Sequence, residues 1–229
     1  MISVDDAVRE ISNGRIIIYP TDTVWGIGCD AFNQDAVDRL FKLKEKKEPG
    51  VSVILNDKEQ IKDFCMVNEY VTNISDNFLP GPITLILKSK KEFANGVTRD
   101  GNIGIRIPKH KISLELAKKT PIITTSANKH GEKIAANIDE AKKIFGEECL
   151  YIDGEQPEGI ESTIIDMSEI SLISPPLFPK NEIVFAPFFF DISKPLVTFF
   201  EFPLVEIPIT MSPGLTKLSH CLLKTTSKE

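Results

Sequence analysis

The 229-residue sequence has few of the residues that build metal centres or disulfide frameworks. Its four cysteines lie far apart without a CxxC pair, and its three histidines are scattered along the chain. These spacings argue against a zinc site or a disulfide-stapled fold, and a reducing cytoplasm is the expected compartment. The motifs GxxxxGK[ST], GxGxxG, HExxH and GxSxG are absent, so the common NTPase, dehydrogenase, metalloprotease and hydrolase classes lose support.

Long apolar runs and a basic leader are missing as well. No stretch of about 18 uncharged apolar residues occurs, so no membrane-spanning helix and no membrane partner are expected. The acidic N-terminus MISVDDAVRE predicts a helix rather than a secretory signal. The formal charge of −6 argues against a surface tuned as a whole to nucleic acid. An anionic ligand would therefore need a local cluster of cations.

Apolar runs alternate with amphipathic stretches from residue 1 to about residue 170, a pattern that predicts one α/β domain. We expect strands at Arg15–Tyr19, Val51–Leu55, Ile83–Leu87, Ile103–Arg106, Ile122–Thr125 and Thr163–Asp166. We expect helices at Asp35–Leu43, Asn68–Phe78, Lys111–Lys119 and Asp139–Phe145.

The composition changes at about residue 171. Eight of the fifteen prolines lie between Pro175 and Pro213, and eight of the fourteen phenylalanines lie from Phe178 onward. Prolines at this density would interrupt a central strand or a long helix. Residues 171–229 are therefore an atypical segment without an assigned domain, either irregular or edge structure packed on the domain or a poorly ordered tail.

Polar side chains gather where two predicted strands end. The stretch YPTDTVWGIG places Thr21, Asp22 and Thr23 after an apolar run, and its two glycines predict a turn. The stretch PIITTSANKHG ends another buried run in three hydroxyls and Asn128. Capping of the next segment explains one or two of these side chains and not all of them. Because open α/β sheets bind ligands at the carboxyl ends of strands, we expect both loops to line one crevice.

Two sets of cations are candidates for binding an anion. Lys42, Lys44, Lys46 and Lys47 crowd the predicted end of a helix, where they form a solvated basic helix end or contact phosphate oxygens. Arg106 lies in the apolar stretch GIRIP, where it needs a carboxylate of the fold or a bound phosphate as its partner. The sequence leaves both pairs of alternatives open.

Six stretches in order make the chain similar to the YrdC-like family of threonylcarbamoyl-AMP synthases: YPTDTVWGIG, Lys44-x-Lys46, PGPITLILK, IGIRIP, TTSAN and ESTIID. The resemblance covers about residues 8 to 170 and not the rest of the chain. It implies an α/β fold in which an open twisted mixed sheet with flanking helices forms a deep basic cavity. Residues 1–170 would then be a YrdC-like catalytic domain.

The resemblance also implies a nucleotidyltransferase reaction in which L-threonine, bicarbonate and ATP give threonylcarbamoyl-AMP and pyrophosphate. Partner proteins that modify tRNA would then pass the threonylcarbamoyl group to the adenosine beside the anticodon, and a contact with tRNA or RNA is a further expectation. A Mg²⁺ ion is expected to accompany the ATP. Positioning and electrostatic stabilisation should supply most of the rate acceleration.

Individual site residues are assigned by the same resemblance. The residues with an implied catalytic role are Lys44, Lys46 and Arg106. The residues with an implied nucleotide-binding role are Lys44, Lys46, Ser126 and Asn128. The residues with an implied substrate-binding role are Thr23, Ser52, Thr84, Arg106 and Ser162. A site that donates hydrogen bonds to the substrate hydroxyl would reject analogues without that hydroxyl.

The chain departs from the family pattern in two places. The family commonly has Lys-x-Arg where this chain has Lys44-Glu45-Lys46, and the segment up to Ser52 is about one residue shorter. After STIIDMS the family continues into an Arg-x-Gly strand, whereas Arg106 is the last arginine of this chain. These departures keep a second hypothesis open, a YrdC-like module that binds RNA or a nucleotide with weak or no catalysis. A third is a carbamoyl-transfer domain related to hydrogenase maturation.

Overall fold

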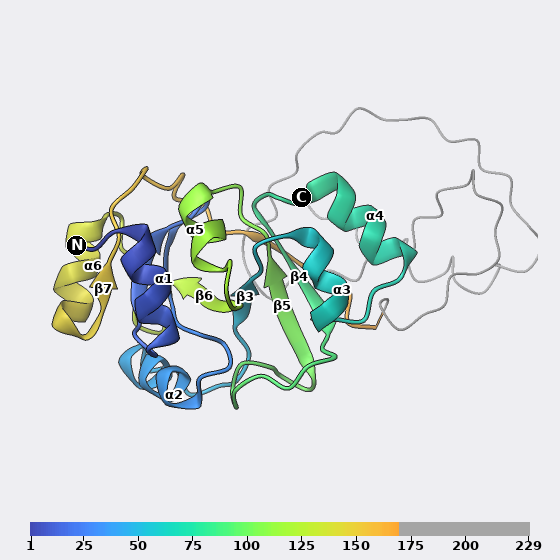
Figure 1. Cartoon of the computed structure of the whole chain (residues 1–229), viewed down its shortest axis with the longest axis horizontal. Helices are drawn as coiled ribbons and strands as arrows, with labels where there is room; N and C mark the ends of the chain where they lie inside the picture. The colour runs from blue at the N-terminus through green and yellow to red at the C-terminus, as the bar shows by residue number, and fades with distance from the viewer. Residues whose placement is uncertain (170–229) are drawn as a thin grey trace, which may run out of the picture. The chain divides into compact units, whose positions relative to one another are not determined.

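The computed structural model of the chain describes residues 1–169 (Figure 1). The expectations for residues 171–229 lie outside this range. At the centre is an eight-stranded mixed sheet in the order β7-β1-β2-β6-β3-β5-β4-β8. The strands are β1 (Ile17–Pro20), β2 (Trp25–Gly28), β3 (Ser52–Ile54), β4 (Ile83–Lys88), β5 (Asn102–Arg106), β6 (Ile122–Ser126), β7 (Leu150–Tyr151) and β8 (Thr163–Asp166).

Helices flank this sheet, and most begin at a side chain that caps them. Ser3, Asn33, Asn68 and Asn137 each accept a backbone N–H of the first helical turn, which satisfies a donor that the helix leaves free. The helices are α1 (Val4–Ser12), α2 (Gln34–Leu43), α3 (Ile61–Phe64), α4 (Glu69–Phe78), α5 (Lys111–Leu116) and α6 (Ile138–Phe145), with 3₁₀ turns η1 (Lys58–Gln60) and η2 (Gly146–Glu148). The expected α/β fold with a mixed sheet and flanking helices is confirmed.

The expectation that Gly26 and Gly28 form a turn after β1 is wrong, because both glycines belong to strand β2. β2 pairs antiparallel with β1, with Tyr19 opposite Gly26. The glycines are needed for close approach, because a Cβ on Gly28 would lie 1.7 Å from the carbonyl oxygen of Ile123. A Cβ on Gly26 would lie 3.2 Å from the Tyr19 ring.

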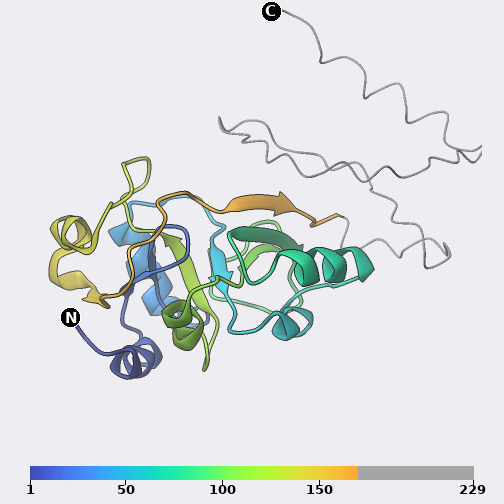
Figure 2. The same ribbon diagram turned by 90° about the horizontal axis from the view of Figure 1, so that it is seen from above.

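The sheet separates two apolar cores. On one face, Ile18, Ile27 and Val53 belong to a core that also holds side chains of α2, α3, α4 and α6. On the other face, Ile17 and Ile54 pack with side chains of α1 and α5. These two helices lie next to each other in both views (Figures 1 and 2). We call this second side the α1/α5 face.

The described helices are too short or too polar to cross a membrane.

Candidate functional site

A band of small and polar residues crosses the middle of the α1/α5 face. Strand pairing places Gly26 opposite Ser126, Thr124 opposite Ser52, and Ser52 opposite Gly104. Residues opposite each other on neighbouring strands share a face, so these five residues form one surface, the polar band. Side chains this small keep the backbone close to anything that binds there.

Arg106 reaches across this face to the connection between β1 and β2. Its Nη2 donates to Asp22 Oδ1 at 3.0 Å and to Thr23 Oγ1 at 2.9 Å. In the sheet order β6 and β3 lie between β2 and β5, so these contacts link parts of the sheet that are not neighbours. The strand arginine therefore has a carboxylate partner within the fold.

The Arg106 guanidinium still has an N–H group without a hydrogen-bond acceptor among the described residues. Its side chain is only 7% exposed, and its Nε is buried without a hydrogen-bond partner. Burial lowers the pKa of Arg106, and the neighbouring Asp22 carboxylate opposes that shift. An unpaired buried N–H is costly, so Nε is the edge of this side chain that a ligand can satisfy.

Asp22 lies in the loop that the sequence placed at the crevice, but sequence reasoning gave it no binding or catalytic role. Its second oxygen, Oδ2, accepts the backbone N–H of Lys109 at 2.9 Å, so the carboxylate ties the β1–β2 connection to the loop after β5. Two features of the sequence pointed towards this pair. An arginine in an apolar strand needs a carboxylate partner, and Asp22 is an aspartate between two threonines at a strand exit. The choice of Asp22 as that partner depends on the fold.

Lys44 occupies the C-cap of α2 and is 4% exposed. Its Nζ donates to the carbonyl oxygens of Ser126 and Asn128, each at 2.6 Å, and lies 3.4 Å from Asn128 Oδ1. Three acceptors therefore match the three ammonium protons. Burial lowers the pKa of Lys44 to about 8, and the charge of Lys46 adds to this effect. Lys44 is not a solvated cation at a helix end.

The loop after β6 is joined to the end of α2 by further bonds. Ser126 Oγ donates to Asn128 Oδ1 at 2.7 Å, and Asn128 Nδ2 donates to the carbonyl of Glu132 at 2.7 Å. The Lys129 ammonium pairs with the Glu45 carboxylate at 2.7 Å. Lys46, two residues beyond Lys44, is partly exposed. The structure thus brings Lys44, Ser126 and Asn128 together as one hydrogen-bonded unit.

The remaining candidates are linked by the chain between β7 and β8. These strands lie at opposite edges of the sheet, so residues 152–162, here called the crossing segment, run from one edge to the other (Figure 2). Ser162 Oγ lies 2.8 Å from Thr84 Oγ1 on β4, and the Gly159 N–H donates to the Thr23 carbonyl at 2.7 Å.

Two polar residues of this face were left out of the sequence-based site. Thr124 is 4% exposed and lies in the polar band. Tyr19 is buried, and its hydroxyl donates to the carbonyl of Ile123 at 3.3 Å. Burial raises the pKa of Tyr19. The period-two alternation of residues 122–126 places Thr124 on the same face as Ser126, which is a signal that could have found it.

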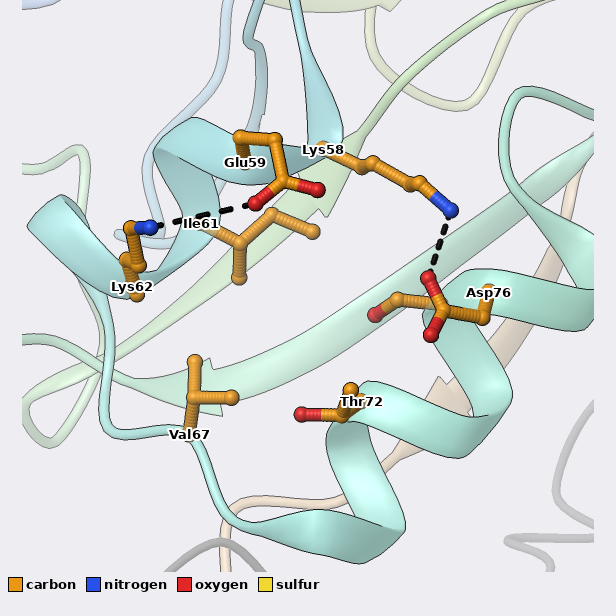
Figure 3. A pocket seen from close by; sticks show the side chains of 8 residues that line it. Lys58, Glu59, Ile61, Lys62, Val67, Thr72 and Asp76 are labelled. Atoms are coloured by element: carbon orange, nitrogen blue, oxygen red, sulfur yellow. Dashed lines mark hydrogen bonds and ion pairs between the residues drawn. The ribbon is translucent and has the colours of Figure 1, made fainter.

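A separate surface pocket lies at η1, α3 and α4 (Figure 3). It is lined by Lys58, Glu59, Ile61, Lys62, Val67, Thr72, Ser75 and Asp76. Each lysine of this pocket forms an ion pair with a carboxylate that also lines it. Lys58 Nζ lies 2.5 Å from Asp76, and Lys62 Nζ lies 3.8 Å from Glu59. Ile61 belongs to the apolar core on the face of the sheet that lies away from α1 and α5. None of the candidate residues lines this pocket.

Metal-binding chemistry has little support within residues 1–169. No group of three His, Cys, Asp or Glu side chains there is placed to hold a metal ion. Cys29, Cys65 and Cys149 are buried free thiols, and burial raises the pKa of each to about 12, so all three are protonated at neutral pH. A Mg²⁺ ion accompanying a nucleotide would have to be held chiefly by phosphate oxygens.

Comparison with known proteins gives a consistent result. Residues 9–174 match the Sua5/YciO/YrdC family model, whose description is "Telomere recombination". The "Putative threonylcarbamoyl-AMP synthase" of Methanocaldococcus jannaschii is 38% identical over 169 residues, covering 72% of this chain and 81% of that protein. The threonylcarbamoyl-AMP synthase of Pyrococcus abyssi is 32% identical over 183 residues, covering 76% of this chain but only 54% of that protein.

A solved structure agrees with this sequence match. The crystal structure of P. abyssi Sua5 complexed with L-threonine matches with a TM-score of 0.65 at 27% identity. The match covers 72% of this chain and 52% of the P. abyssi chain, so the matched part spans about half of the P. abyssi protein.

Proposed function

The chain belongs to the Sua5/YciO/YrdC family, and from this premise we propose that it is an enzyme that makes threonylcarbamoyl-AMP from L-threonine, bicarbonate and ATP. The observation that carries the proposal is the 38% identity to the M. jannaschii protein over most of its length. Residues 1–170 are the catalytic domain in this proposal. The cytoplasm, and partner proteins that use the adenylate to modify tRNA, belong to the same proposal.

The reaction makes modest covalent demands on the protein. The threonine amine first reacts with bicarbonate to give a carbamate and water, and a carbamate oxygen then attacks the α-phosphate while pyrophosphate leaves. Catalysis then depends on holding the reactants in line and on stabilising negative charge. Buried cations and fixed hydroxyls of the kind gathered around the polar band suit both tasks.

We assign the amino-acid substrate to the Arg106 side of the polar band. The unpaired Nε–H of Arg106 would donate one charge-assisted hydrogen bond to the carboxylate. Thr23, Ser52, Thr84 and Ser162 would supply hydrogen-bonding groups around the rest of the molecule.

We assign the nucleotide to the side where α2 ends. Lys46 is the candidate for direct contact with the phosphates, and Ser126 and Asn128 line the adjoining loop. Lys44 already has three acceptors in the protein, which favours a role in ordering that loop over direct phosphate contact. The Mg²⁺ ion would arrive with the ATP.

The hypothesis of a module that binds RNA without catalysis has no comparable support. The relatives are named as synthases, and the crossing segment carries Asp153, Glu155, Glu158 and Glu161 without a lysine or arginine. An acidic segment bonded to the Thr23 loop disfavours a phosphate backbone at that position.

Pyrophosphate release by the full chain tests the proposal. The chain is incubated with ATP, L-threonine and bicarbonate, and each reactant is omitted in turn. Release should require all three, and the nucleotide product should be a threonine-containing adenylate by mass spectrometry. Release that continues without L-threonine, or no release from folded protein, would refute the proposed activity.

A further inference from the structure

The turn that ends α2 holds a glutamate in a backbone conformation that usually belongs to glycine. The Lys46 N–H donates to the carbonyl of Phe41 at 2.9 Å, and the Glu45 N–H donates to the carbonyl of Lys42 at 3.1 Å, which are the two hydrogen bonds of a Schellman motif. Glu45 occupies the left-handed position of this motif with φ +56°. Because a side chain is strained in that region, a reason for the glutamate must come from its carboxylate.

The Glu45 carboxylate is bound by a side chain from a distant part of the sequence. Its Oε1 accepts a hydrogen bond from Lys129 Nζ at 2.7 Å, and Lys129 lies 84 residues further along, in the loop after β6. The hydrogen bond from Lys129 lowers the pKa of Glu45, and the same bond raises the pKa of Lys129. Both groups are therefore charged at neutral pH, and their ion pair joins the end of α2 to the loop after β6.

Lys44 connects the same two elements through backbone groups. Its Nζ donates to the carbonyl oxygens of Ser126 and Asn128, each at 2.6 Å. Its own carbonyl accepts the backbone N–H of His130 at 2.8 Å. We call residues 44–46 the lysine turn. The lysine turn and the loop after β6 are thus joined by the contacts of Lys44 and, on their exposed side, by the ion pair.

We propose that Glu45 is a positioning residue for the nucleotide, because its ion pair with Lys129 fixes the lysine turn against the loop after β6. This inference rests on the proposed function, in which Lys46 of the turn and Ser126 and Asn128 beside it bind ATP. A carboxylate repels phosphate groups, so Glu45 does not contact the nucleotide itself. It acts through Lys129, by keeping the two binding elements in register.

Positioning and simple charge repulsion predict opposite results when the carboxylate is removed. Glu45→Gln takes away a negative charge near the proposed phosphate site, so Coulomb attraction alone would lower the KM for ATP. Loss of positioning would raise that KM instead. Lys129→Gln breaks the same ion pair from its other side. If the pair is the cause, both substitutions raise the KM for ATP by the same factor, and combining them raises it no further.

Steady-state pyrophosphate release by the full chain tests this, with ATP and then L-threonine as the varied substrate. The KM for ATP should rise about threefold in Glu45→Gln, in Lys129→Gln and in the double variant, which is the size expected for an exposed ion pair. The KM for L-threonine should not change, and Lys129→Arg, which keeps the pair, should match the wild type. The control Lys58→Gln breaks the Lys58–Asp76 pair, whose lysine is 34% exposed against 36% for Lys129, and should change neither KM.

Glu45→Gly separates positioning from stability. Glycine relieves the strain of the left-handed backbone but carries no carboxylate, whereas glutamine keeps the strain. Glu45→Gly should therefore melt at a higher temperature than Glu45→Gln and still show the raised KM for ATP. If the KM followed stability alone, the glycine variant would return towards the wild type, and a wild-type KM for ATP in Glu45→Gly would overturn the inference.

Other results would also count against a positioning role. An unchanged or lower KM for ATP in Glu45→Gln, an equal rise in the KM for L-threonine, or single effects of opposite sign that cancel in the double variant would overturn the inference. If circular dichroism shows that Glu45→Gln does not fold, Lys129→Gln and Glu45→Gly must show the rise by themselves. Absence of turnover in the wild type would refute the proposed function instead.

Discussion

Replacing Lys44 with methionine should abolish a pH dependence of stability that this one side chain creates. Lys44 is 4% exposed, and its ammonium is held by backbone carbonyls and not by a carboxylate. Burial therefore costs the charged form more than its partners return, and the pKa falls from 10.5 to about 8. Methionine fills a similar volume and carries no charge.

The size and sign of the effect follow from this pKa. In the unfolded chain Lys44 keeps the ordinary value of 10.5, so between pH 8 and pH 10.5 the unfolded state binds the proton and the folded state does not. The free energy of unfolding then rises with pH across this window and falls again as the pH drops from 10.5 to 8. At about 1.4 kcal/mol for each pKa unit, the whole change is on the order of 3 kcal/mol.

Urea unfolding of the full chain at several pH values measures this change. Trp25, the only tryptophan, is 2% exposed, so its emission reports the unfolding of residues 1–169. The difference in unfolding free energy between the wild type and Lys44→Met should grow by ~3 kcal/mol from pH 8 to pH 10.5. The matched control is Lys47→Met, an exposed lysine near the same helix end, which should follow the wild type. Parallel curves for the wild type and Lys44→Met would refute the reasoning.

Three further substitutions test the site and the fold. Asp22→Asn should raise the KM for L-threonine about tenfold with a smaller change in kcat, because Arg106 loses the charge that orients it; steady-state kinetics with a loss confined to kcat would contradict this. Gly28→Ala should cost more than about 4 kcal/mol, because its Cβ would lie 1.7 Å from the Ile123 carbonyl oxygen. Gly131→Ala, where a Cβ meets nothing within 4 Å but φ is +80°, should cost about 1 kcal/mol, and equal melting temperatures of the two variants would disprove the steric explanation.

Elements with a visible side-chain period were predictable from the sequence. The helix at Glu69–Phe78 has an apolar face and an asparagine cap, and the strand at Ile122–Ser126 continues a β-branched run. β2 was not predictable, because two of its four residues are glycines and show no alternation of side chains. β7 has only two residues, too few for any period.

Part of the grouping of the site residues was also predictable from the sequence. Thr23 and Ser126 follow apolar runs, and the pairing of β1, β2 and β6 brings the two strand exits to one side of the sheet. The partner of Arg106 was not predictable, since any of 33 acidic residues could have served. The burial of Lys44 depends on carbonyls 82 and 84 residues further along the chain, which its local sequence does not reveal.

The two buried cations differ in how their charge is balanced, and this difference bears on where each reactant should bind. Arg106 faces the Asp22 carboxylate, so the pair is nearly neutral and offers a directional N–H. Lys44 is held by carbonyl oxygens and not by a carboxylate, so its ammonium brings a net positive charge to the place where α2 ends. A triphosphate, with several negative charges, is drawn to that net charge, whereas a zwitterionic amino acid gains more from the directional groups around Arg106. The charge distribution alone therefore favours the proposed order of the two substrates across the polar band.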